Sequence, residues 1–246
     1  MKIVTVREDN VDETGFFCFM SKRKNPGWKE KRDWLKDRFK EGLVLKILEL
    51  PDRGMIEYIP ADLAWRPVQA AGYMFIHCLW VVGKSKGQGY AKALLDEAVL
   101  DAKKQGFVGI CMTVSKLGYM KLGKFLANAG FRTVDSALGS YELMALDFGK
   151  AAKPSFAGDW DSKAKACGSG VTMFASGQCP YLKDFADSLK SAAEASGRSF
   201  RIKKLNTAED IRKYSPTPYG VCDVVVDGKA VPIFYETAKY LEKLGS

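Results

Sequence analysis

The stretch VVGKSKGQGYAKALLDEA, residues 81–98, most constrains how this chain can fold. An almost wholly apolar run, residues 72–82, leads into it and is typical of a strand that is covered on both faces. An amphipathic helical pattern follows it, with apolar residues three and four positions apart. The loop between the two contains two lysines and two glycines: Lys84, Lys86, Gly87 and Gly89. The sequence therefore predicts a strand, a basic turn and a helix in direct succession.

This loop has the features of an anion-binding site. Glycines allow the backbone to approach a ligand closely and leave N–H groups directed outward. The N-terminus of the following helix adds a partial positive charge, and the combination suits a pyrophosphate. A dinucleotide fingerprint is excluded because its third glycine is Lys92 here, and a P-loop is excluded because its first glycine is Cys78. An ordinary strand-to-helix turn is the alternative.

Residues 79–98 resemble motif A of the GNAT acetyltransferases, which consists of a strand, a splayed turn and an amphipathic helix. The turn of that family has the pattern Gln/Arg-x-x-Gly-x-Gly/Ala, and residues 84–89 match its spacing with a lysine at the first position. The positive charge is kept, whereas the bidentate geometry of arginine is lost. The order of the expected elements also matches the family over residues 1–148. The resemblance implies a mixed α/β fold, acetyl-CoA as the acyl donor and an amine as the acceptor.

The resemblance also implies where acetyl-CoA binds. Backbone N–H groups near the end of the strand polarise the thioester carbonyl, which is oxyanion stabilisation by fixed donors. The loop and the first turn of the helix hold the pyrophosphate. The residues assigned to the donor on this basis are Leu79, Val81, Val82, Lys84, Lys86, Gly87, Gln88, Gly89, Tyr90 and Ala91.

The sequence offers several candidates for the groups that transfer protons. Many family members carry a tyrosine where this chain has Leu126, and Tyr119 is the nearest substitute. His77, the only histidine, has a suitable pKa for a general base, and a packed core histidine is the alternative. Cys78 is expected on the opposite face of the strand, either as a thiol near the thioester or as a buried structural cysteine. Glu57 is a further candidate base or a surface carboxylate.

The composition changes after the first 148 residues. Residues 149–169 are rich in small and polar side chains and resemble a linker. Residues 170–246 resemble a thioredoxin-like domain of the YoaP-like type, which occurs on some acetyltransferases. Cys179 precedes a helix N-terminus, where a thiol pKa is lowered, so it is a candidate reactive thiol. Leu182 stands where a dithiol site needs its second cysteine, and a degenerate fold used for packing, dimerisation or gating is the alternative.

Hydrophobic periodicity and turn residues predict the other elements. Strands are expected at residues 2–6, 43–50, 55–59, 107–114, 141–148, 171–175, 200–205, 221–226 and 230–234. Helices are expected within residues 12–39, with a break at 25–27, and at 119–129, 179–195, 208–214 and 236–244.

Charge and composition narrow the function further. The formal net charge is +9, but the lysines and arginines are spread along the chain, so nucleic acid is not expected as a partner. No run approaches the roughly 18 apolar residues of a membrane span, and a cytoplasmic protein is expected. The six cysteines form no CxxC pair, so no metal site is expected. A homodimer stays open, and a catalytically weakened CoA-binding or thiol-redox sensing protein is the alternative to a transferase.

Overall fold

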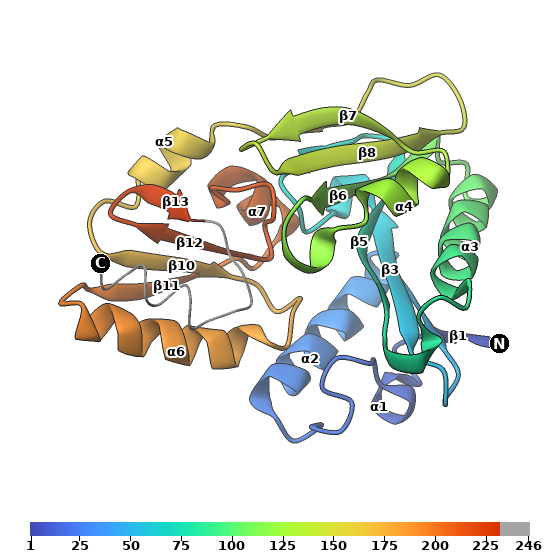
Figure 1. The fold of residues 1–246 in the computed structure, drawn as a ribbon, viewed down its shortest axis with the longest axis horizontal. Helices are drawn as coiled ribbons and strands as arrows, with labels where there is room; N and C mark the ends of the chain where they lie inside the picture. Colours follow the sequence, from blue (N-terminus) through green and yellow to red (C-terminus); the bar gives the residue numbers. More distant parts are fainter. Residues whose placement is uncertain (232–246) are drawn as a thin grey trace.

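The computed structural model describes residues 1–231 of the 246-residue chain, apart from the side chain of Tyr119. The N-terminal part of the described chain contains a seven-stranded sheet in the order β1-β2-β3-β5-β6-β8-β7 (Figure 1). Its strands are β1 (Ile3–Val6), β2 (Val44–Leu48), β3 (Gly54–Pro60), β5 (Tyr73–Val81), β6 (Gly109–Ser115), β7 (Arg132–Ala137) and β8 (Tyr141–Asp147). The mixed α/β fold predicted from the sequence is confirmed.

The sheet is split between its two central strands. β5 pairs with β6 in parallel, but only from Tyr73 to Ile76. β5 then continues to Val81 against β3, and β6 continues to Ser115 against β8. The facing edges of β5 and β6 therefore separate beyond Ile76, and backbone groups along them have no strand partner among residues 1–231.

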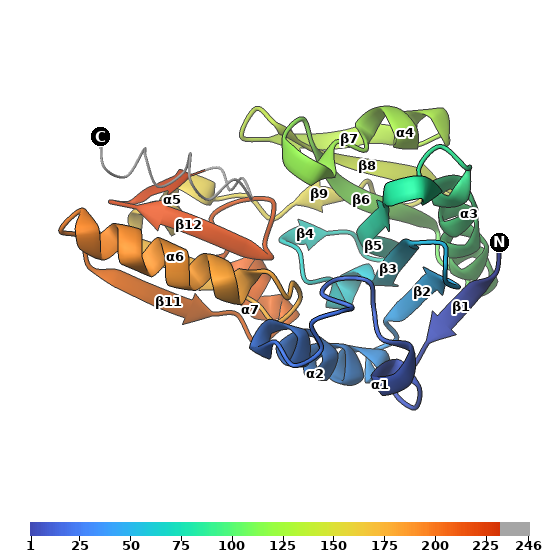
Figure 2. The ribbon, with the colours of Figure 1, turned by 60° about the horizontal axis from the view of Figure 1, so that its bottom comes forward.

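Helices cover both faces of this sheet (Figures 1 and 2). One face is covered by α1 (Val11–Thr14) and α2 (Pro26–Lys40), the other by α3 (Tyr90–Lys104) and α4 (Gly123–Asn128). The start of α2 is set by Asn25, whose side chain accepts the N–H of Gly27 at 2.8 Å, and by the proline that follows it. The apolar rows of α3 bury Leu94, Leu95 and Ala98 against the sheet.

The C-terminal part has its own sheet of four described strands, in the order β11-β10-β12-β13. Its strands are β10 (Val171–Ala175), β11 (Phe200–Lys204), β12 (Cys222–Val226) and β13 (Lys229–Val231), and its helices are α6 (Leu182–Ala195) and α7 (Ala208–Tyr214). β10 and β11 are parallel, and the other neighbouring pairs are antiparallel. Leu182, Phe185 and Leu189 of α6 are buried in this part of the molecule.

The segment expected as a linker contains regular structure. Its strand β9 (Ser155–Phe156) pairs with β4 (Val68–Gln69) of the N-terminal part, and α5 (Trp160–Lys165) follows. The two parts of the chain also meet where α2 lies beside the start of α6 (Figure 2). A Cβ atom on Gly27 would lie only 2.1 Å from the carbonyl oxygen of Pro180, so this close approach depends on glycine.

Other differences from the predicted elements have simple reasons. The helix expected at residues 119–129 is divided into a short turn, η3 (Gly118–Met120), and α4. The edge strand β7 was not predicted because its side chains are mostly polar and its exposed face breaks the apolar pattern. The helix expected at residues 236–244 lies outside the described residues. Among residues 1–231, no helix combines the length and apolar character needed to cross a membrane.

Candidate functional site

The basic loop follows β5 directly, as the sequence predicts. It starts with a short turn, η2 (Gly83–Ser85), and ends where α3 begins. Gly87 and Gly89 have φ angles of 78° and 79°, in the left-handed region that favours glycine. A Cβ atom at either position would meet nothing within 4 Å, so the space above the loop is open.

The loop presents a run of backbone donors. Within the described chain, the N–H groups of residues 87–92 have no acceptor, and the first N–H accepted inside α3 is that of Ala93, by the carbonyl of Gly89 at 3.1 Å. These groups lie at the positive end of the helix dipole, and Lys84 and Lys86 are exposed beside them. Tyr90 and Ala91 occupy the first turn of α3. The arrangement suits a multiply charged phosphate group.

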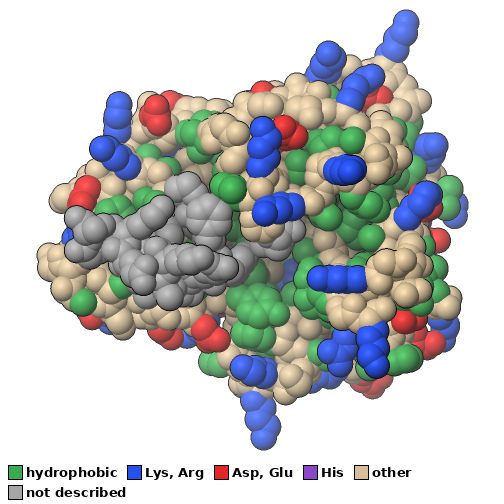
Figure 3. Space-filling model, in the orientation of Figure 1, with side chains coloured by type: hydrophobic (Ala, Val, Ile, Leu, Met, Phe, Trp, Pro, Cys, Tyr) green, Lys and Arg blue, Asp and Glu red, His purple; other side chains and the backbone are tan. Residues whose placement is uncertain are grey.

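The strand before the loop offers further donors. Leu79 and Val81 lie on the part of β5 that has no β6 partner. The N–H of Val82 is engaged, because it donates to the carbonyl of Arg53 at 3.1 Å. The N–H of Arg53 in turn donates to the hydroxyl of Ser85 at 2.9 Å, which attaches the loop to the turn between β2 and β3. Hydrophobic side chains gather where β5, β6 and α4 meet, with Lys and Arg side chains around them (Figure 3).

A β-bulge interrupts β5 just before these residues. Glu57 of β3 pairs with Cys78, whereas the next residue, Tyr58, pairs with Ile76, so His77 is an extra residue in β5. The bulge breaks the alternation of the strand, and His77 and Cys78 line the same pocket. The prediction that Cys78 points to the opposite face is therefore wrong.

The pocket has a volume of about 340 Å³ and lies between the two parts of the chain. Its wall is mostly apolar and includes Trp80 of β5 together with Tyr181 and Tyr219 of the C-terminal part. Tyr181 also packs edge-on against Phe19, with ring centroids 4.3 Å apart. The full lining comprises Cys18, Lys31, Met55, Glu57, Arg66, His77, Cys78, Trp80, Gln178, Cys179, Pro180, Tyr181, Tyr219 and Val221.

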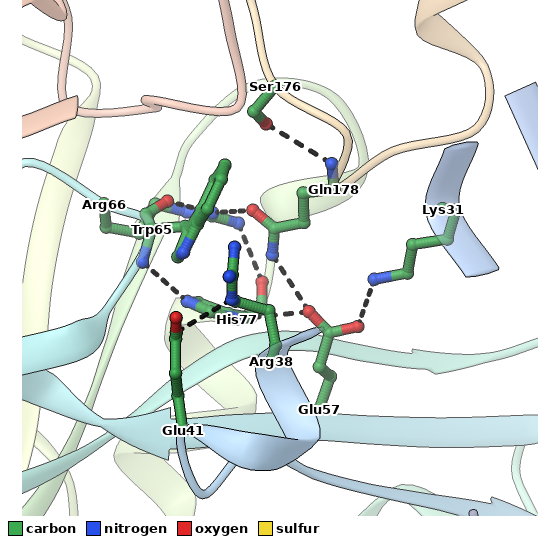
Figure 4. Close-up of polar contacts among 9 residues, drawn as sticks. All are labelled: Lys31, Arg38, Glu41, Glu57, Trp65, Arg66, His77, Ser176 and Gln178. Carbon is green, nitrogen blue, oxygen red and sulfur yellow. Dashed lines mark hydrogen bonds and ion pairs between the residues drawn. The ribbon is translucent and has the colours of Figure 1, made fainter. Parts of the chain in front are cut away.

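Glu57 is the centre of a buried polar network in this pocket (Figure 4). Its Oε2 atom accepts from Lys31 Nζ at 2.5 Å. Its Oε1 atom accepts from Gln178 Nε2 at 3.0 Å and lies 3.2 Å from Nδ1 of His77. Burial alone would raise the pKa of Glu57, but the Lys31 ammonium and the hydrogen bond from His77 lower it to about 2. The side chain is only 1% exposed, so its description as a surface carboxylate is wrong.

His77 is neutral and fully hydrogen bonded. Its Nε2 atom accepts the backbone N–H of Trp65 at 2.9 Å, which places the ring proton on Nδ1, where it is donated to Glu57. Burial lowers the pKa of His77 to about 4. In this arrangement neither ring nitrogen has a free lone pair for a substrate proton.

Arg66 continues the network toward the C-terminal part (Figure 4). Its Nη1 atom donates to the carbonyl of Trp65 at 2.7 Å and to Oε1 of Gln178 at 2.5 Å. Its Nη2 atom donates to the carbonyl of His77 at 2.9 Å, and the guanidinium lies 5.7 Å from the ring of Tyr219. Gln178 lies in the loop between β10 and α6. It therefore joins Glu57 to Arg66 across the boundary between the two parts. No local motif in the sequence marks Lys31, Arg66 or Gln178.

Cys18 and Cys78 are free thiols. Burial raises the pKa of Cys78 to about 12 and also raises that of Cys18, so both are neutral. Cys179 lines the pocket together with both of them, and Cys222 is buried. No group of three or more His, Cys, Asp or Glu residues in the described chain is arranged to hold a metal ion.

Positions 126 and 119 are the two at which a tyrosine acid was expected or sought from the sequence. Leu126 is fully buried in α4, so an apolar side chain occupies the position at which many family members carry tyrosine. Tyr119 belongs to η3, and its side chain lies outside the described residues.

Comparison with known proteins places the chain in a family. It is 34% identical to the uncharacterised N-acetyltransferase YoaP of Bacillus subtilis (strain 168) over 248 residues, which cover 99% of this chain and 98% of YoaP. No family model matches the chain. On the similarity to YoaP, the chain belongs to the GNAT family of N-acetyltransferases, and the protein is an acetyltransferase.

Solved structures were also compared with the fold. The ribosomal-protein-alanine N-acetyltransferase from Brucella melitensis is 15% identical and covers 60% of this chain and 100% of its own, with a TM-score of 0.45. The PaiA N-acetyltransferase from Thermoplasma acidophilum, in complex with coenzyme A, is 16% identical and covers 60% and 100%, with a TM-score of 0.42. The family assignment rests on YoaP and not on these structures.

Proposed function

We propose that the enzyme transfers the acetyl group of acetyl-CoA directly to a primary amine in the pocket between its two parts. One observation carries this proposal: a single strand, β5, borders the pocket and leads into the loop. Cys78 and Trp80 of β5 line the pocket, and β5 runs without a break into the loop with the free N–H groups. A donor bound along the end of β5 would bring its thioester to the wall of the pocket.

The donor site is assigned to the loop and to the free strand edge. The N–H groups of residues 87–92 and the ammonium groups of Lys84 and Lys86 would bind the pyrophosphate. The N–H groups of Leu79 and Val81 are the candidates for polarising the thioester carbonyl. The N–H of Val82 donates to the carbonyl of Arg53, so it would not bind the donor. Val82 would instead fix the point at which the turn begins.

The chemistry requires an amine that has lost one proton. The amine nitrogen attacks the thioester carbon, the C–N bond forms, the C–S bond breaks, and the CoA sulfur leaves as a thiolate. The nitrogen loses its second proton to give the amide, and the thiolate takes up one proton to give free CoA. A carboxylate has about four lone-pair sites. The three donors around Glu57 leave one site on Oε2, so Glu57 is the group that contacts the acceptor ammonium. Because both of its nitrogens are engaged, His77 is assigned as a positioning residue for Glu57.

The other two catalytic candidates have different roles in this proposal. Cys78 has a neutral thiol and contributes to the wall next to the thioester. Tyr119 stays a candidate for the acid that protonates the leaving thiolate, since it lies in the turn that follows β6.

We further propose that residues 1–148 form the acetyltransferase domain and that residues 170–246 form a thioredoxin-like domain, joined by residues 149–169. The support is a parallel β10-α6-β11 unit followed by the antiparallel pair β12 and β13, in the order β11-β10-β12-β13. Leu182 occupies the second-cysteine position beside Cys179. The domain would therefore serve to close the acceptor pocket with Gln178, Tyr181 and Tyr219, and Cys179 would be part of its wall.

The proposal is tested by titrating the full chain with acetyl-CoA in a calorimeter and then measuring thiol release with a panel of primary amines. Micromolar binding of acetyl-CoA and amine-dependent thiol release are expected. Glu57→Gln should bind acetyl-CoA like the wild type and release thiol far more slowly. Absence of acetyl-CoA binding by the wild type would overturn the proposal.

A further inference from the structure

The charged groups of the pocket do not balance. Lys31 and Glu57 form an ion pair at 2.5 Å, and His77 is neutral, so their contributions cancel. Arg66 is 4% exposed, and no carboxylate of the described residues lies within 4.0 Å of its guanidinium. Glu57 reaches Arg66 only through Gln178. A buried charge without an ionic partner is costly, so an anion in the pocket would be bound favourably.

A second acidic group, Asp223, is electrostatically coupled to Arg66 without forming an ion pair with it. Burial raises the pKa of Asp223 to about 6, although its hydrogen bonds and the charge of Arg66 act in the opposite direction. The carboxylate of Asp223 accepts hydrogen bonds from the hydroxyls of Ser215 and Thr217, so its oxygens are directed to those groups. Its attraction for Arg66 is therefore weaker than that of a contacting carboxylate.

The guanidinium also retains donors. Three of its five N–H groups are donated to neutral oxygens, those of Trp65, His77 and Gln178. The Nε–H and one N–H of Nη2 have no acceptor among residues 1–231. Guanidinium groups bind carboxylates through paired, charge-assisted hydrogen bonds, which are stronger than bonds to neutral acceptors. Arg66 is thus equipped to bind a carboxylate of a ligand.

The position of Arg66 relative to Glu57 sets the kind of ligand. One amide group, that of Gln178, touches both side chains: its Nε2 atom donates to Glu57, and its Oε1 atom accepts from Arg66. The anionic and the cationic group are therefore separated by one amide group and its two hydrogen bonds, of 3.0 and 2.5 Å. This spacing suits a molecule whose ammonium and carboxylate are attached to the same carbon atom.

The remaining wall sets the size and polarity of the ligand. At about 340 Å³, the pocket is at the small end of ligand sites, which hold roughly 300–1,000 Å³. Met55, Trp80 and Val221 line it together with two tyrosines, so the body of the ligand is in contact with apolar atoms. A small apolar molecule fits this wall better than a polar or a highly charged one.

We infer that the acceptor is an apolar α-amino acid, with Glu57 binding its ammonium group and Arg66 binding its carboxylate. The inference rests on the proposed function, in which this pocket holds the acceptor. Gln178 fixes the two binding groups relative to each other, which would make the C-terminal part necessary for acceptor recognition.

The test compares acceptors that differ only in the carboxylate. Leucine, methionine and phenylalanine are each paired with the amine that remains after loss of the carboxyl group, and kcat/KM is measured by thiol release. The wild type is expected to prefer each amino acid over its amine by on the order of 10- to 100-fold, the value of one or two charge-assisted hydrogen bonds. Equal or better use of the amines that lack the carboxylate would overturn the inference while leaving the proposed function intact.

Two variants make the test specific to Arg66. Arg66→Met removes the charge, and Gln178→Glu places a carboxylate of the protein beside the guanidinium. Both should abolish the preference and retain acetyl-CoA binding, whereas Arg66→Lys should keep part of it. A preference that survives in Arg66→Met and Gln178→Glu would overturn the assignment of the carboxylate site.

A binding measurement separates the inference from the proposed function. Leucine and 3-methylbutylamine are titrated into the full chain in a calorimeter in the absence of acetyl-CoA. Binding of leucine that is lost in Arg66→Met supports the inference even if no turnover is found. Absence of leucine binding by a wild type that binds acetyl-CoA and acetylates other amines would overturn it.

Discussion

Nδ1 of His77 lies 3.2 Å from Oε1 of Glu57, and this contact joins an extra residue in one strand to a carboxylate on the neighbouring strand. It exists because the bulge turns His77 toward the pocket. The opposite ring nitrogen is bonded to the N–H of Trp65, so the orientation and the tautomer of His77 are both fixed. Glu57 is thereby held in place by His77, Lys31 and Gln178.

Acid is expected to destabilise the protein through His77. The pKa of His77 is about 4 in the folded protein, whereas the ordinary pKa of histidine, which applies to the unfolded chain, is 6.5. Between these two pH values the unfolded chain therefore binds a proton that the folded protein does not bind. The free energy of unfolding should fall by about 3 kcal/mol as the pH decreases through this interval. Asp223 acts in the opposite direction, since burial raises its pKa to about 6. Urea unfolding at pH 7 and 4.5 should show a smaller decrease for His77→Gln than for the wild type.

This comparison isolates His77, because Asp223 is present in both proteins. Glu57 also stays ionised in the folded protein at pH 4.5, the lower limit of the comparison. Its contribution to the free energy of unfolding is lost only as the pH falls from 4.5, the ordinary pKa of glutamate, to about 2, its pKa in the folded protein. An equal pH dependence of the two proteins would contradict the assignment of a buried neutral imidazole.

The contribution of Glu57 and Lys31 to stability should be separable from the contribution of Glu57 to the reaction. Glu57→Gln leaves the Lys31 ammonium buried without a carboxylate and should cost about 3–5 kcal/mol of stability. Lys31→Met in the same chain removes that charge and should recover most of the loss. Thiol release should stay low in the double variant, because the carboxylate that we propose to contact the amine is missing. A stable double variant with wild-type turnover would exclude Glu57 from the reaction.

The donor loop was predictable because its residues are contiguous. A strand, two glycines, two lysines and a helix follow one another between residues 72 and 104, and each part is specified by local preferences. The structure confirms the order of these elements and the left-handed glycines. The binding of acetyl-CoA to the individual residues stays a proposal.

The pocket was not predictable in the same way. Lys31, Arg66 and Gln178 come from three distant segments, and only the tertiary fold brings them to Glu57. The face of Cys78 depends on a one-residue register shift, which simple alternation does not reveal. Buried polar residues also carry no periodic signal, since each is defined by its partners and not by its neighbours in the sequence.

The contact between the two parts should be sensitive to Gly27. Gly27→Ala would place a Cβ atom 2.1 Å from the carbonyl oxygen of Pro180, a backbone atom two positions from Gln178. We expect a loss of about 1–3 kcal/mol in stability from this overpacking, together with weaker acceptor use. Binding of acetyl-CoA should be retained, because the donor loop lies on the N-terminal part. Gly149→Ala is the matched control, since its Cβ would meet nothing within 4 Å; equal acceptor kinetics in both variants would contradict a shared pocket.

The donor loop should bind acetyl-CoA more weakly when a β-branched residue replaces Gly89. Valine is strained at a φ of 79°, by about 1–3 kcal/mol, so the loop is expected to rearrange and its N–H groups to lose their common direction. Calorimetry should show acetyl-CoA binding weakened by about tenfold or more. Gly139→Val is the matched control, because Gly139 has a φ of 68°, equally open surroundings and a position in the turn between β7 and β8. The control variant bears comparable strain and should bind acetyl-CoA like the wild type, whereas unchanged affinity in Gly89→Val would remove this loop from the donor site.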